Sequence, residues 1–175
     1  MTHTGDASVH ASAVLVDNRA VLIRGPSGSG KSHLAFDLIL AGRAGQIPKA
    51  VLIGDDRVHL QASNGQLMVR PARELAGLIE IRGLGIRHCE FAQEALVGLV
   101  VDLCADDAER LPPAEALQAN ISGVLIPRIP VGRGFEPLPM VLAALIMAAS
   151  SSFDQPSPDC SKGIGNHMSP NIAIE

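Results

Sequence analysis

The sequence contains no tryptophan and no tyrosine, and four phenylalanines bring its aromatic content to only 2%. The aromatic faces on which single-stranded nucleic acids stack are therefore almost absent, and the core must be built from aliphatic side chains. A basic surface is lacking as well, since 18 acidic residues outnumber 14 Lys and Arg residues and leave a formal net charge of −4. The composition thus argues against a nucleic-acid partner.

Cysteines are few and are not arranged in pairs. Cys89, Cys104 and Cys160 form no C-x-x-C motif, which argues against a zinc site or a disulfide framework and is typical of reduced thiols in a cytoplasmic protein. The first ten residues lack the apolar stretch of a signal peptide. The longest apolar run, 141–149, is about half as long as a membrane span, so we expect a buried helix there and no membrane partner.

The chain has enough apolar residues, 47% of 175, to fill the core of one domain. We assign this domain to residues 1–152. From residue 153 onward the periodic pattern is lost among Ser, Pro, Gly and Asn, so residues 153–175 are predicted to form a mobile tail.

Apolar runs in the first 135 residues predict many strands and only one helix. Strands are expected at 8–16, 20–24, 50–54, 57–62, 66–70, 95–103 and 122–131. Helices are expected at 33–43 and 140–150, and the polar segment 104–120 is expected to be a loop with one helical turn. This order predicts an α/β domain with a mixed, strand-rich sheet and helices on one side, unlike the even alternation of a parallel sheet.

The stretch GPSGSGKS at 25–32 fits the phosphate-binding loop pattern G-x-x-x-x-G-K-[ST]. A strand before it and a helix after it are the context that this motif requires. The expected nucleotide-binding residues are Gly25, Pro26, Ser27, Gly28, Ser29, Gly30, Lys31 and Ser32. Lys31 would bind the β- and γ-phosphate oxygens, and the hydroxyl of Ser32 suits a Mg²⁺ ligand. A glycine-rich turn without function is the alternative.

Two sets of carboxylates lie at the ends of buried strands. Asp55 and Asp56 come directly after the strand at 50–54, where one acid could lie beside a metal and the other could take a proton from a hydroxyl. Asp102, near the end of the strand at 95–103, could be the metal-side acid instead. The pattern alone does not separate these two possibilities.

Three further residues have both a functional and a structural interpretation. Glu80 is expected in a strand, where it could bind a metal or simply pair with Arg82 on the same face. Arg133, between two glycines, could bring positive charge to a moving phosphoryl group or could be an ordinary loop residue. His10 in an early strand is by itself more often structural than catalytic.

Taken in order, these segments resemble the catalytic domain of bacterial HPr kinase/phosphorylase, which phosphorylates a serine of the phosphocarrier protein HPr. The resemblance covers about residues 8–150 and includes the glycine loop, GDDRV at 54–58 and PVGRG at 130–134. Its most specific part is LIEIRGLGI at 78–86, which ordinary phosphate-loop kinases lack.

The resemblance implies a fold related to phosphoenolpyruvate carboxykinase, ATP and Mg²⁺ as cofactors, HPr as partner, and a homohexamer. It also implies the roles of the site residues. His10, Lys31, Asp55, Asp56 and Arg133 would be catalytic, with Asp56 as the favoured proton acceptor for the serine. Ser32 and Glu80 would bind magnesium.

The sequence also departs from that family. It begins almost at the histidine, like a short form with the catalytic domain alone, and it has His33 where the long form usually has Glu. The connector AGQIPK at 44–49 lengthens the segment between the loop lysine and the aspartates. The C-terminal region linked to dephosphorylation is not recognisable in SSFDQPSPDCSK, so kinase activity is better supported than phosphorolysis.

We therefore expect an ATP-dependent protein-serine kinase acting on HPr in regulation of the sugar phosphotransferase system. A small-molecule kinase and a nucleotide-sensing NTPase are the alternatives. The sequence identifies neither allosteric regulators nor which HPr paralogue is the target.

Overall fold

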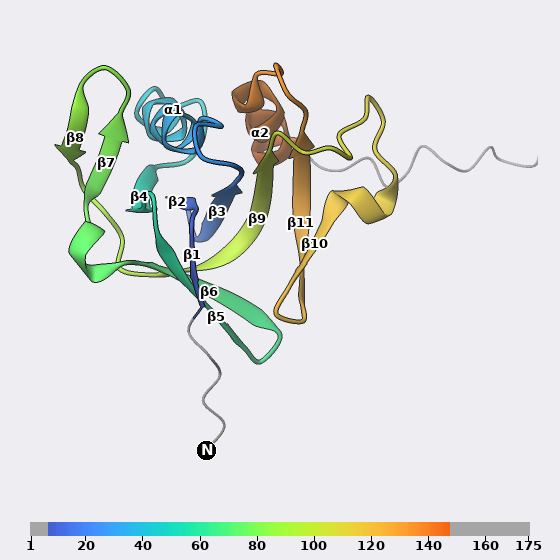
Figure 1. The fold of residues 1–175 in the computed structure, drawn as a ribbon, viewed down its shortest axis with the longest axis horizontal. Helices are drawn as coiled ribbons and strands as arrows, with labels where there is room; N and C mark the ends of the chain where they lie inside the picture. The colour runs from blue at the N-terminus through green and yellow to red at the C-terminus, as the bar shows by residue number, and fades with distance from the viewer. Residues whose placement is uncertain (1–6, 148–175) are drawn as a thin grey trace, which may run out of the picture.

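The computed structural model describes residues 7–147, which form a nine-stranded mixed sheet, a separate two-stranded hairpin and two α-helices (Figure 1). The strands of the large sheet are β1 (Ala7–Val9), β2 (Ser12–Val16), β3 (Arg19–Arg24), β4 (Ala50–Gly54), β5 (Val58–Ser63), β6 (Gln66–Pro71), β9 (Ala95–Leu103), β10 (Gln118–Ile121) and β11 (Val124–Val131). The small hairpin consists of β7 (Leu78–Ile81) and β8 (Gly85–His88), and the helices are α1 (Lys31–Arg43) and α2 (Pro137–Ile146).

Three parallel strands, β3, β9 and β11, form the centre of the sheet, and their neighbours are antiparallel. The register aligns Arg24 of β3 with Asp102 of β9, and Asp102 with Pro130 of β11. Parallel strands are normally covered on both faces, which explains the nearly continuous apolar runs in β3 and β9. The carboxyl ends of the three strands meet at one edge of the sheet.

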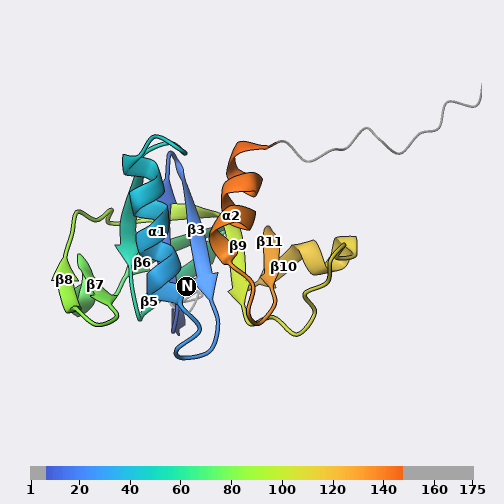
Figure 2. The ribbon, with the colours of Figure 1, turned by 90° about the horizontal axis from the view of Figure 1, so that it is seen from above.

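Each face of the central strands has its own core. Both α-helices cover one face, as the two views show (Figures 1 and 2), and α1 buries a stripe of apolar residues there. The opposite face is covered by the β5–β6 hairpin and by β10, whose buried residues join those of β3 and β9. This predicted arrangement, with the helices on one side, is confirmed.

Helix α1 begins directly at Lys31, after a loop whose last residue, Gly30, has a φ of 95°. The amide of Leu34 donates to the carbonyl of Gly30 at 2.9 Å, which closes the first helical turn. A residue with a side chain would be strained at this φ, so glycine allows the chain to turn from β3 into the helix. Within residues 7–147, neither helix is long and apolar enough to cross a membrane.

Several element boundaries differ from those predicted. The strand expected at 8–16 is divided into β1 and β2, because β1 pairs with β5 whereas β2 pairs with β3 and β4. The segment predicted as a loop, 104–120, ends in β10, which is joined to β11 by a two-residue turn. Both turn residues, Ser122 and Gly123, have positive φ, and serine is an unusual residue for that position.

The second predicted helix also differs from the structure. It begins at Pro137, whose fixed φ favours the first helical turn, and it ends at Ile146 rather than at residue 150. It is also not the buried helix that was expected, since Val141 is its one fully buried residue in the range described. The tail predicted for 153–175, and Cys160 within it, lie outside the described residues.

Candidate active site

A cleft of about 980 Å³ opens over the glycine loop (residues 25–30) and the start of α1. It lies between α1 and the β7–β8 hairpin, which are neighbours in Figure 1. Its lining residues are His10, Ser27, Gly28, Ser29, Gly30, Lys31, Ser32, His33, Phe36, Asp37, Leu40, Asp56, Glu80, Ile81 and Arg82. Most of the residues selected from the sequence therefore meet in one place.

Lys31 is the buried cation of the cleft, with only 6% of its surface exposed. Its ammonium group donates to the carbonyl oxygens of Gly25 and Pro26, each at 3.0 Å, so the lysine folds back over the loop from which it comes. Burial lowers the pKa of Lys31 below its usual value, against the opposing attraction of Asp55 and Asp56. The loop thus holds a partly desolvated positive charge, which is suited to attract an anion.

Asp55 is the buried carboxylate of the site, and three donors from three elements surround it. Its Oδ1 accepts hydrogen bonds from the hydroxyls of Ser12 and Ser32, the latter at 2.9 Å. Its Oδ2 accepts a hydrogen bond of 3.1 Å from the amide of Glu80. The carboxylate therefore joins β2, the start of α1 and β7 at one point.

Asp56 is exposed and lies next to His10. The Nε2 atom of His10 is 3.3 Å from Oδ1 of Asp56, with 47% and 71% of the two side chains exposed. Asp56 has a φ of 62°, and the amide of Arg57 donates to the carbonyl of Asp55 at 2.7 Å across it. This tight turn directs two consecutive carboxylates differently, one into the protein and one into the cleft.

Glu80 lies in β7, and its exposed side chain lines the same cleft as the glycine loop. The alternative in which it pairs with Arg82 is not seen, because no ion pair joins them in the described part of the chain. On the other wall, His33 lies 3.4 Å from Asp37, one helical turn further along α1. His33 therefore lines the site beside Ser32 and has an acidic partner on its own helix.

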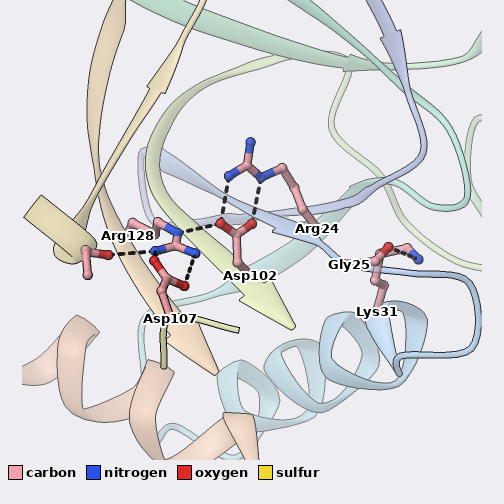
Figure 3. A network of polar contacts seen from close by, with 7 residues as sticks. Arg24, Gly25, Lys31, Asp102, Asp107 and Arg128 are labelled. Carbon is pink, nitrogen blue, oxygen red and sulfur yellow. Dashed lines mark hydrogen bonds and ion pairs between the residues drawn. The ribbon is translucent and has the colours of Figure 1, made fainter. Parts of the chain in front are cut away.

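Asp102, the alternative metal-side acid, lies outside the cleft. Its carboxylate is bound by two guanidinium groups, those of Arg24 and Arg128, as Figure 3 shows. Burial by itself would raise the pKa of Asp102, but the hydrogen bonds from the two arginines outweigh this effect and hold the pKa below its usual value. The geometry therefore favours Asp55 as the acid beside Ser32.

Arg133 is exposed in the turn after β11 and does not line the cleft. It makes no hydrogen bond or ion pair within residues 7–147. Because two strand spacings separate β3 from β11, their aligned ends lie about 10 Å apart. The arginine is thus placed at the same edge of the sheet as the glycine loop, but at a distance from it.

Two groups of site residues were missed by the sequence analysis. Ser12 was overlooked, although a lone polar residue in the apolar strand SAVLV is a signal that it has a buried partner. The apolar part of the cleft, formed by Phe36, Leu40 and Ile81, was missed because such residues usually belong to the core. These side chains give the cleft an apolar wall beside its charged floor.

The protein-family model of the HPr serine kinase C-terminal domain matches residues 2–152 of the chain. The chain belongs to this family. The resemblance predicted from the sequence, and the strand-rich mixed α/β fold, are thereby confirmed.

Two curated relatives of this HPr serine kinase C-terminal domain are named HPr kinase/phosphorylase. The one from Mycoplasma mycoides is 33% identical over 73% of the chain and 43% of its own length. The one from Lactobacillus delbrueckii is 31% identical over 85% of the chain and 49% of its own length. The chain thus spans less than half the length of these two relatives.

A solved structure has the same fold as this domain. The Hpr(Ser) kinase/phosphatase from Coxiella burnetii matches with a TM-score of 0.63 and 27% sequence identity, over 80% of the chain and 93% of that structure. Nearly the whole of that structure therefore has a counterpart here.

Proposed function

We propose that this domain is an ATP-dependent protein-serine kinase that phosphorylates HPr on a serine and so regulates the sugar phosphotransferase system and carbon metabolism. The observation that carries the proposal is the convergence of the glycine loop, Asp55 and the His10–Asp56 pair around one cleft. Membership of a family whose curated relatives are named HPr kinase/phosphorylase supports the choice of partner.

The donor half of the proposed site consists of the glycine loop and the first residues of α1. Backbone amides at the start of a helix attract phosphate oxygens, and Lys31 adds its positive charge. On binding, the ammonium group would exchange its two loop carbonyls for phosphate oxygens, which are stronger acceptors because they are charged.

The oxygen donors beside the loop fit a magnesium ion. Mg²⁺ prefers hard oxygen ligands and is usually held by one or two carboxylates together with substrate phosphates. Ser32 and Asp55 already touch each other, and Glu80 faces the same cleft, so these three residues would hold the ion. Within residues 7–147 no three His, Cys, Asp or Glu side chains form a metal-binding cluster. Bound Mg²⁺ would neutralise the negative charge of the transferring phosphoryl group.

The acceptor half of the proposed site consists of Asp56 and His10. Asp56 would accept the proton of the HPr serine hydroxyl as its oxygen attacks the γ-phosphorus of ATP and the bond to ADP breaks. His10 lies within reach of the same carboxylate and would orient it. Arg133 would approach from the turn after β11 and stabilise the moving charge.

The test is transfer of labelled phosphate from ATP to purified HPr in the presence of Mg²⁺. Labelling should be strong with the unchanged chain and lost in Lys31→Ala and in Asp56→Asn, with Glu90→Gln as a distant control. Labelling of a small metabolite instead of HPr would contradict the proposal. Nucleotide binding with no labelled product at all would indicate a sensing module.

Two further properties stay predictions and have their own measurements. Phosphorolysis would convert phosphoserine-HPr and inorganic phosphate into HPr and pyrophosphate, so pyrophosphate release measures it directly. Assembly into a hexamer is measured by sedimentation velocity. Neither result changes the test of kinase activity.

A further inference from the structure

A network of four charged side chains lies beside the glycine loop and outside the cleft (Figure 3). Arg24 binds the Asp102 carboxylate through Nε and Nη2, each at 2.7 Å, and Arg128 binds it through Nε. Arg128 then binds Asp107 through Nη1 and Nη2, at 2.7 and 2.9 Å, and the carbonyl of Ala116 at 2.8 Å. Two positive and two negative groups thus balance one another; we call them the Asp102 network.

The network joins the three parallel strands near their carboxyl ends. Arg24 is the last residue of β3, Asp102 is its aligned partner in β9, and Arg128 comes from β11. All three side chains lie on the face opposite the two helices, because they continue the alternation of buried residues such as Leu22, Val100 and Ile126. The network therefore takes the place of the next apolar layer in that core.

On the side of β3, the network borders the glycine loop. Gly25 follows Arg24 directly and packs closely on β9: a Cβ at Gly25 would lie 3.0 Å from both Cβ and the carbonyl oxygen of Leu103. Leu103 is the neighbour of Asp102. The carbonyl of Gly25 in turn accepts from the ammonium group of Lys31. The place of Lys31 thus depends on how the ends of β3 and β9 are held together.

On the side of β11, the network borders the turn that carries Arg133. Arg128 lies three residues before the end of β11, and the carbonyl of Val131 accepts a hydrogen bond of 2.9 Å from Ala105, just after β9. The amide of Phe135 closes the turn by donating to Gly132 at 3.3 Å. The position of this turn, residues 132–135, is therefore fixed from β9 as well.

An ionic network at this position is suited to fixing geometry. Replacing buried ion pairs with apolar residues often leaves stability unchanged or improves it. A gain in stability therefore does not account for three part-buried charges, those of Arg24, Asp102 and Arg128, at the end of an otherwise aliphatic layer. Forked guanidinium–carboxylate contacts, in contrast, are directional and restrict both distance and angle. Apolar side chains at the same three positions would allow the strands more freedom to slide.

We propose that Arg24, Asp102 and Arg128 are positioning residues that hold the glycine loop and the 132–135 turn in one fixed relation. This inference rests on the proposed function, in which the loop holds the phosphoryl donor and Arg133 stabilises its transfer. Removing a contact on the β11 side of the network therefore displaces the glycine loop, and removing one on the β3 side displaces the 132–135 turn. No network residue touches the cleft.

The test measures effects across the network in the whole chain. Arg24→Gln, on β3, and Arg128→Gln, on β11, are compared with Glu90→Gln, which cuts the exposed ion pair with Lys49 far from the network. Amide hydrogen exchange is followed in peptides covering 25–32 and 132–136. Affinity for a fluorescent ATP analogue with Mg²⁺ is measured in parallel.

A positioning role predicts that each variant acts at the opposite end. Arg128→Gln should speed exchange in 25–32 on the order of tenfold and raise the dissociation constant of the nucleotide at least about fivefold. Arg24→Gln should speed exchange in 132–136, and Glu90→Gln should change neither segment. Exchange that increases only beside the replaced residue, with unchanged nucleotide affinity, would overturn the proposal.

Two features keep the test decisive. Arg24→Lys and Arg128→Lys keep the positive charge but lose the forked guanidinium, so they can be used if a glutamine variant fails to fold. They should speed exchange at the opposite end of the network as the glutamine variants do. Exchange and nucleotide affinity equal to those of the unchanged chain would contradict a role for the forked geometry. The proposed kinase function fails separately, when the unchanged chain does not label HPr. Hydrogen exchange needs no substrate, so its result stands in either case.

Discussion

The hydroxyl of Ser32 at the start of α1 donates a hydrogen bond of 2.9 Å to Oδ1 of Asp55, the residue that follows β4. The two residues are 23 positions apart in the chain. Their contact places the end of the glycine loop against the acid that the site would use for a metal. Asp55 is thus both a structural acceptor and a candidate ligand, and the two roles can be separated by substitution.

Asp55→Asn should reduce both stability and labelling of HPr. The buried carboxylate accepts three hydrogen bonds, whereas an asparagine turns a donor toward one of its partners, which costs about 1–3 kcal/mol of unfolding free energy. Urea denaturation and phosphate transfer measure the two effects. Ser12→Ala removes one donor alone and should cost about 1 kcal/mol while labelling continues. Loss of labelling in Ser12→Ala would show that the structural role of Asp55 cannot be separated from its role in the site.

Asp56 carries backbone strain that glycine would relieve. Its φ of 62° is unfavourable for an alanine by about 1–2 kcal/mol. We therefore expect Asp56→Ala to be about 1 kcal/mol less stable than Asp56→Gly, while neither labels HPr. Urea denaturation of both variants checks the order. Equal stabilities would contradict the strain, and retained labelling in either variant would contradict the role of Asp56 as proton acceptor.

Gly25→Ala should weaken nucleotide binding through a local collision. The new Cβ would lie 2.7 Å from Oγ of Ser29, and a φ of 152° is unfavourable for alanine. Oγ of Ser29 is buried without a hydrogen-bond partner in the described chain, so Ser29→Ala should be nearly neutral by itself. The double variant should recover part of the nucleotide affinity, because the collision with Oγ of Ser29 is removed. Recovery should be incomplete, because the close contact with the Leu103 carbonyl remains. Titration with a fluorescent ATP analogue measures all three variants.

The Asp102 network should make stability depend on acidity. Because the folded-state pKa of Asp102 lies below its ordinary value of 3.8, its stabilising contribution is complete above that value and is lost as pH falls through the lower, folded pKa. Asp102→Asn should be about 3 kcal/mol less stable at neutral pH, and it should lose less stability than the unchanged chain between about pH 5 and pH 2. Urea denaturation across this range checks the slope. A slope identical to that of the unchanged chain would exclude a role for Asp102 in it.

The sequence was most informative where a local pattern determines structure. The apolar run of β3, the glycines of the loop and the periodicity of α1 predicted a strand, a turn and a helix that the structure confirms. The turn at Asn64 and Gly65 was predictable for the same reason, since both residues readily adopt positive φ.

Contacts between residues on different strands could not be predicted from the sequence pattern. Asp55 follows one apolar strand and Asp102 lies near the end of another, so they were equivalent as candidates. Only the parallel register, which sets Asp102 beside Arg24, shows that the carboxylate of Asp102 is bound by arginine. The roles assigned to His10, Glu80 and Arg133 stay predictions until the variants are measured.

The long separations within the Asp102 network have a consequence for folding kinetics. Arg24 and Asp102 are 78 positions apart, and Asp102 and Arg128 are 26 apart, so the network forms only after distant parts of the chain have met. Contacts between distant residues form slowly, because a long loop must close first. A nascent chain that ends before β11 would contain the complete GPSGSGKS motif but not the partner that completes the network. We therefore expect nucleotide affinity to appear as the last step of refolding, later than the secondary structure.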